Sequence, residues 1–95
     1  MKAYELLAKP EAWTQNAYAR NAKGKKVDFD SREAVAWCCS GAIRLVTGEK
    51  SGPFPASNKS INRAAEAIGC TVINWNDHPG RTHSEVVALL KELDI

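Results

Sequence analysis

The sequence has no hydrophobic run that approaches the ~20 apolar residues needed to cross a membrane. It has only three cysteines, two of them adjacent, so a framework of paired disulfides is not expected. The apolar stretch at the N-terminus is too short for a secretory signal, and Glu5 interrupts it. We therefore expect a cytoplasmic protein with reduced thiols and no contact with a membrane.

An excess of charge of one sign is also lacking. The formal net charge is +2 at pH 7, which is too small to indicate a nucleic-acid partner by itself. Charged residues make up 25% and hydrophobic residues 44% of the chain, as in ordinary globular proteins. A chain of 95 residues suffices for at most one domain, so we expect residues 1–95 to form a single globular domain.

The clearest predicted element is a helix over residues 31–47. Asp30 or Ser31 is a good N-cap, Glu33 completes the spacing of a capping box, and Gly48 is suited to end the helix. The helix would carry a wide apolar face, which is typical of a central helix. This face comprises Ala34, Val35, Trp37, Cys38, Ala42, Leu45 and Val46.

Three other segments favour helices. Residues 2–9 form a short helix that a following proline limits, and residues 57–68 follow a Ser-Asn cap and end at a glycine. Residues 83–93 have the sharpest start, because Thr82 and Glu85 have the spacing of a capping box.

Two stretches are predicted to be non-helical connections. Residues 70–73 are a short buried run, interpreted as a strand fragment or an extended connection, and residues 75–81 are interpreted as a turn. Near residues 17–29, two short runs flank Gly24, which can supply a positive φ, and this pattern predicts a small β-hairpin. The expected fold is mainly α, a compact bundle-like domain of about four helices with that hairpin.

The segment 74–82 is the most distinctive of the chain. We favour a structural interpretation in which its polar residues form caps and an Asx turn around the Pro-Gly pair. The alternative is a polar-aromatic rim at a helix N-terminus, where anions bind well. The candidate binding residues are Trp75, Asn76, Asp77, His78 and Arg81.

Cys38 and Cys39 invite a hypothesis of thiol chemistry. Adjacent helical residues point about 100° apart, so the pair is poorly placed to chelate a metal. Gly41 belongs to a run of small residues after the two cysteines, which would let another segment approach the helix closely. We therefore favour close packing over a nucleophile, and we predict no metal and no cofactor, because no recognised zinc spacing is present. An enzyme using Asp77 and His78 with Cys38 stays an alternative, provided that these side chains converge on one pocket.

A basic turn covers residues 20–26 and contains no acidic residue. We interpret it as a solvated turn. The alternative is a weak anion or nucleic-acid contact, although the turn lacks the interleaved aromatics of better nucleic-acid sites. The residues concerned are Arg20, Lys23, Lys25 and Lys26.

Three stretches, in this order, resemble a family of small bacterial and phage proteins catalogued as a domain of unknown function. They are residues 21–27, residues 34–42 and residues 75–82 with the following Glu85-Val86. In that family the second stretch contains W-C-A-x-G-A and the third reads W-N-D-x-P-G-R-T. Here Cys39 stands at the usual alanine, which suggests a requirement for a small residue, and the region around Lys9-Pro10 departs from the family's longer first helix.

The resemblance implies a cytoplasmic protein of a bacterium or phage, and it implies no activity. Since caps and turns explain the polar residues, and no acid-base constellation is recognisable, we expect a non-enzymatic binding or accessory domain. We expect another protein as its partner rather than nucleic acid, and the sequence leaves the oligomeric state open.

Overall fold

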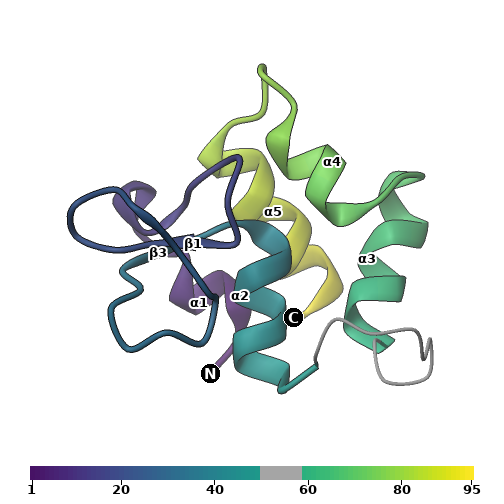
Figure 1. Ribbon diagram of the computed structural model, residues 1–95. Coiled ribbons are helices and arrows are strands. Elements are labelled where there is room, and N and C mark those ends of the chain that lie inside the picture. The colour runs from purple at the N-terminus through teal and green to yellow at the C-terminus, as the bar shows by residue number, and fades with distance from the viewer. Residues whose placement is uncertain (50–58) are drawn as a thin grey trace.

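Helix α2 lies at the centre of the fold, in contact with α1, α3 and α4 (Figure 1). The computed structural model describes residues 1–49 and 59–95. Within these ranges the chain forms five α-helices and a small antiparallel sheet, which confirms the prediction of a mainly helical fold with a hairpin. The helices are Ala3–Leu6 (α1), Cys39–Thr47 (α2), Lys59–Ile68 (α3), Val72–Asp77 (α4) and His83–Leu93 (α5).

The sheet has three very short strands in the order β2-β1-β3, with both pairings antiparallel. The predicted hairpin supplies the first two strands, and its turn contains Gly24 at a φ of 79°. A 3₁₀ helix over Pro10–Ala12 precedes the sheet. The strands are Ala19–Arg20 (β1), Lys26–Val27 (β2) and Ala36–Trp37 (β3).

The prediction of one helix over residues 31–47 is wrong in its first half. The backbone of Val35 donates to the Arg20 carbonyl at 2.9 Å and that of Cys38 donates to the Tyr18 carbonyl at 3.0 Å, so this stretch pairs with the hairpin instead. Helix α2 begins only at Cys39, after Cys38 in an extended conformation. The apolar residues that suggested one helical face are shared between a strand and a helix, and Val35 is 50% exposed.

The prediction of a strand fragment or extended connection over residues 70–73 is also wrong, and the predicted turn over residues 75–81 begins only at His78. Residues Val72–Asp77 form α4, capped by Thr71, whose hydroxyl accepts from the Asn74 backbone at 3.2 Å. The β-branched pair Val72-Ile73 favours a strand locally. Burial of Val72 and Asn76, four residues apart on one helical face, overrides that preference.

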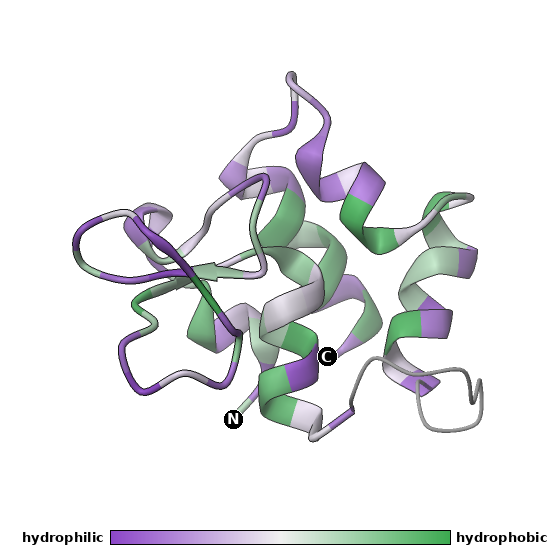
Figure 2. Ribbon diagram, viewed as in Figure 1, coloured by the Kyte–Doolittle hydropathy of each residue, from purple (hydrophilic) through white to green (hydrophobic). Residues whose placement is uncertain are grey.

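The hydrophobic core has buried residues from all five helices, and green stretches on the helices in Figure 2 mark their apolar residues. Its largest fully buried side chains include Leu7, Ile43 and Leu90. The last helix follows its prediction closely, because Thr82 and Glu85 form the expected capping box. The predicted cap at Ser57 or Asn58 and the loop before it lie outside the described residues. No described helix has the length and apolar character that a membrane span needs.

Candidate functional site

Asn76 joins three segments of the chain at the inner face of α4. Its side chain is completely buried, and its Oδ1 accepts from the indole Nε1 of Trp13 at 2.7 Å and from the backbone of Cys39 at 2.9 Å. Its Nδ2 donates to the carbonyl of Thr14 at 3.1 Å and to Oδ1 of Asp77 at 3.0 Å. The amide therefore makes four hydrogen bonds within the protein, which is its full capacity.

Asp77 and Gln15 connect the residues just before β1 to the end of α4. Oδ1 of Asp77 also accepts from the backbone of Asn16 at 2.9 Å, and Asn16 has a φ of 65°, a conformation that asparagine tolerates. Gln15 Nε2 donates to the carbonyls of Asn76 at 2.8 Å and His78 at 2.9 Å. The bond to Asn76 satisfies a carbonyl at the end of the helix, where the helix itself supplies no partner, and the His78 carbonyl accepts from the Arg81 backbone as well.

Arg81 and Trp75 form a second unit, at the turn between α4 and α5. The Arg81 guanidinium carbon lies 4.0 Å from the centre of a Trp75 ring, in the geometry of a cation–π contact. Its Nε donates to the carbonyl of Trp75 at 2.9 Å, and its Nη1 pairs with Glu85 at 3.1 Å. The guanidinium therefore links the C-terminal part of α4 to the first turn of α5.

The two histidines lie at different places. His78 is exposed, and its Nδ1 accepts from the backbone of Gly80 at 3.1 Å. His83 is bonded through Nε2 to the carbonyl of Leu7, and its ring lies 6.4 Å from that of Trp13. The predicted binding residues thus form two internally bonded units, and only the side chain of His78 stands outside both.

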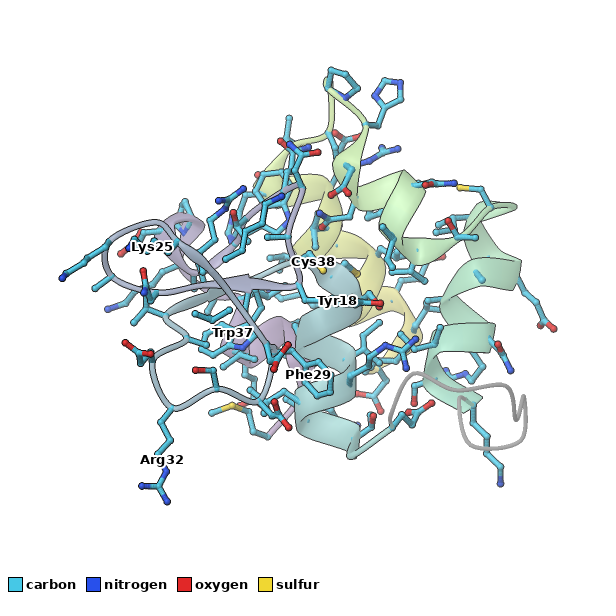
Figure 3. All side chains as sticks on the ribbon, in the orientation of Figure 1. Tyr18, Lys25, Phe29, Arg32, Trp37 and Cys38 are labelled. Atoms are coloured by element: carbon cyan, nitrogen blue, oxygen red, sulfur yellow. The ribbon has the colours of Figure 1, made fainter. Side chains whose placement is uncertain are left out.

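A cavity of about 240 Å³ opens beside these units. Two of its lining residues are large apolar side chains that stay partly exposed, Tyr18 at 36% and Ile73 at 37%. Figure 3 shows the Tyr18 ring lying over the first turns of α2, with Cys38 at the start of that helix. We call this hollow the Tyr18 cavity, and it is lined by Asn16, Ala17, Tyr18, Cys38, Ile73 and Asp77.

Cys38 faces this cavity as the N-cap of α2. Its Sγ accepts from the backbone of Gly41 at 3.3 Å. Burial raises the pKa of the Cys38 thiol and the Asp77 carboxylate raises it further, which outweighs the lowering by the Gly41 N–H. Burial also raises the pKa of Cys39 strongly. Both thiols are therefore protonated at neutral pH, whereas a nucleophilic cysteine needs a lowered pKa.

Gly41 lets the cavity wall approach α2. A Cβ at this position would overlap the carbonyl oxygen of Tyr18. The run of small residues in the sequence indicated such a close approach, and the approaching segment is residue 18 of the hairpin. No comparable signal in the sequence indicates that Tyr18, Asn16 and Ile73 are neighbours, because the pattern around Ile73 favours an extended chain. A helical pattern with Val72 and Asn76 inward would have left Ile73 exposed beside them.

The basic turn is divided in the structure. Arg20 is engaged internally, since its guanidinium donates to Thr14 Oγ1 at 2.9 Å, to the Gly24 carbonyl at 3.0 Å and to the Gln15 carbonyl at 3.1 Å. The three lysines are exposed, and Figure 3 shows Lys25 pointing away from the molecule. The Arg20 guanidinium is therefore not available to bind an anion together with these lysines.

Fold and site together define a small, mainly helical protein with a buried polar junction around Asn76 and an apolar cavity beside it. The chain belongs to a family of unknown function, DUF6197, whose family model matches residues 1–93. The resemblance to a family of unknown function is thereby confirmed. No curated protein and no solved structure matches the chain.

Proposed function

We propose that the protein is a non-enzymatic protein-binding domain, and that the Tyr18 cavity is its contact surface. One observation carries the proposal: two large apolar side chains, Tyr18 and Ile73, stay partly exposed around a hollow whose walls are held by internal hydrogen bonds. A partner would be an intracellular protein of the bacterium or phage that carries the gene. The resemblance to small bacterial and phage proteins supports this location.

The Tyr18 cavity suits an anchor side chain of a protein partner. Its volume is about 240 Å³. Protein interfaces concentrate their binding energy in a few anchor side chains that fill pockets of this kind. Backbone movement on binding would be small, because Asp77 and Gly41 hold the cavity walls in place.

The same geometry supports a role without catalysis. Asp77 and Cys38 share the cavity, but His78 does not belong to its described lining. Cys38 is a protonated helix cap, and Asp77 uses one oxygen for structural bonds. The enzyme hypothesis requires the three side chains to meet in one pocket, and the described lining of the Tyr18 cavity includes two of them.

Site-specific photo-crosslinking in the native host tests the proposal. A benzophenone amino acid is placed at Ile73, on the cavity, or at Leu45, which is equally exposed on α2 at 38% but does not line the cavity. We expect a discrete crosslinked protein from position 73, identified by mass spectrometry, and little of it from position 45. The adduct at position 73 should decrease in a Tyr18→Ala background.

Two results would overturn the proposal. One is equal crosslinking from both positions, which would indicate random encounters. The other is turnover of a substrate that is abolished by Asp77→Asn or His78→Ala in folded protein, which would establish an enzyme.

A further inference from the structure

We infer that the Tyr18 cavity accepts a lysine side chain of the partner protein. This inference rests on the proposed function, and it specifies the chemistry of the anchor. It follows from three features of the lining: its charge, the number of carboxylate oxygens available to a ligand, and its apolar walls.

The cavity lining carries one formal charge, the carboxylate of Asp77. A second hollow shares Ala17 and Tyr18 with it, and there Lys26 and Asp28 balance each other. The two adjoining hollows therefore carry a net negative charge, on a chain whose overall charge is +2. A negative group in an apolar hollow favours a cationic ligand, because partial desolvation strengthens the attraction between unlike charges.

Only one oxygen of this carboxylate is available to a ligand. Oδ1 already accepts from the Asn16 backbone and from Asn76 Nδ2, and within residues 1–49 and 59–95 no hydrogen bond reaches Oδ2. A guanidinium binds a carboxylate best in a two-oxygen fork, whereas an ammonium binds as a point charge. The geometry at Asp77 therefore favours lysine over arginine.

The remaining lining suits the stem of a lysine. Ala17, Tyr18 and Ile73 offer apolar surface, and a lysine side chain buries its four methylene groups along such surface while its charged end reaches a polar group. The Tyr18 ring is itself supported, because it meets the Phe29 ring edge-on at a centroid distance of 6.2 Å. The cavity thus combines an apolar wall with a carboxylate at one place, which matches the two parts of a lysine side chain.

The inference is tested by titrating the ¹⁵N-labelled protein with N-acetyl-lysine methylamide and following amide shifts by NMR. The matched probes are N-acetyl-arginine methylamide, with the other cation, and N-acetyl-norleucine methylamide, with a similar stem and no charge. We expect saturable shifts at Ala17, Tyr18 and Ile73 with the lysine probe, with a Kd on the order of millimolar, as suits a single anchor. Both other probes should bind at least about fivefold more weakly.

The variant Asp77→Asn removes the charge and keeps an acceptor oxygen for the structural bonds of Asn16 and Asn76. It should weaken binding of the lysine probe about tenfold, the loss typical of one hydrogen bond to a charged group, and leave binding of the norleucine probe unchanged. The control Glu33→Gln removes an exposed carboxylate outside the cavity lining and should change neither. An unchanged thermal midpoint for Asp77→Asn shows that the fold is retained.

Equal binding of the lysine and norleucine probes, or equal or tighter binding of the arginine probe, would overturn the inference. So would the absence of saturable shifts at the cavity with the lysine probe. None of these results bears on the crosslink from position 73, which decides the proposed function separately. A partner captured there with an uncharged anchor would leave the binding function intact and refute the lysine.

Discussion

The backbone of Gly41 lies so close to the carbonyl of Tyr18 that no side chain fits between them. The amide of Cys38 donates to the same carbonyl at 3.0 Å. One carbonyl thus joins the hairpin to the start of α2, and it sets where the Tyr18 ring stands over that helix (Figure 3). Because Tyr18 forms part of the cavity wall, this contact links the packing of the helix to the proposed binding surface.

Gly41→Ala should therefore destabilise the protein by roughly 1–3 kcal/mol, the usual cost of overpacking a tight contact. The matched control is Gly80→Ala, because a Cβ there would meet only the His78 ring, at 3.6 Å. Urea unfolding followed by tryptophan fluorescence gives both free energies. If the two variants lose the same stability, the contact with Tyr18 is not what requires a glycine.

Asn76→Ala should be the most damaging single substitution among the predicted binding residues. It would leave the indole N–H of Trp13 and the amide of Cys39 buried without an acceptor, at about 1–3 kcal/mol each. We expect a loss of roughly 2–5 kcal/mol, a large part of the stability of a small domain. Denaturant unfolding measures the loss directly.

The control for this substitution is Asn74→Ala, on the exposed face of the same helix. It should change stability by no more than about 0.5 kcal/mol, as exposed substitutions usually do. A small effect of Asn76→Ala, similar to that of the control, would show that the buried junction contributes little to stability.

Arg81→Lys should destabilise the protein by about 1–2 kcal/mol even though the charge is kept. Lysine would lose the contact of the guanidinium with the Trp75 ring and the bond from Nε to the Trp75 carbonyl. Arg32→Lys is the matched control, because Arg32 is exposed and points away from the molecule in Figure 3. Thermal unfolding of the two variants makes the comparison, and an equal midpoint for both would argue against a structural role for the contact between Arg81 and Trp75.

Stability should fall at alkaline pH because of the buried thiols. Burial raises the pKa of Cys39 far above its ordinary value of 9.0, so the unfolded chain releases this proton first as the pH rises. The contribution is complete below about pH 9 and is lost above it, at a slope that approaches about 1.4 kcal/mol per pH unit. Cys38 shifts in the same direction.

The variant Cys39→Ala separates this effect from the titration of lysine and tyrosine. Its free energy of unfolding, measured from pH 8 to pH 10.5, should decline less steeply than that of the unchanged protein. Parallel curves would mean that the Cys39 thiol titrates alike in the folded and unfolded chains.

The sequence indicated those elements whose signals are local. The capping box of Thr82 and Glu85 marks the start of α5, and Gly24 marks the hairpin turn, because both depend on residues a few positions apart. Helix α2 was predicted too long because the pairing of Ala36 and Trp37 with β1 is a contact between distant segments. Helical periodicity alone does not show such pairing.

The sequence indicates two residues of the polar junction, Asn76 and Asp77, but neither their arrangement nor the Tyr18 cavity. Asn76 and Asp77 were singled out as polar residues that could bond their own backbone. The structure instead directs them to Thr14 and Asn16, about 60 positions earlier in the chain. The local Asx interpretation failed because these two residues belong to a helix that buries one of them against a distant segment.

The bond from the Cys39 amide to the buried oxygen of Asn76 has a further consequence for hydrogen exchange. This amide proton can reach solvent only when α4 separates from the start of α2. Its exchange rate therefore reports how often those two helices part, independently of fraying elsewhere. A ligand that held them together would slow deuterium uptake at this single position. The exchange rate of this one amide therefore measures how often the two helices separate.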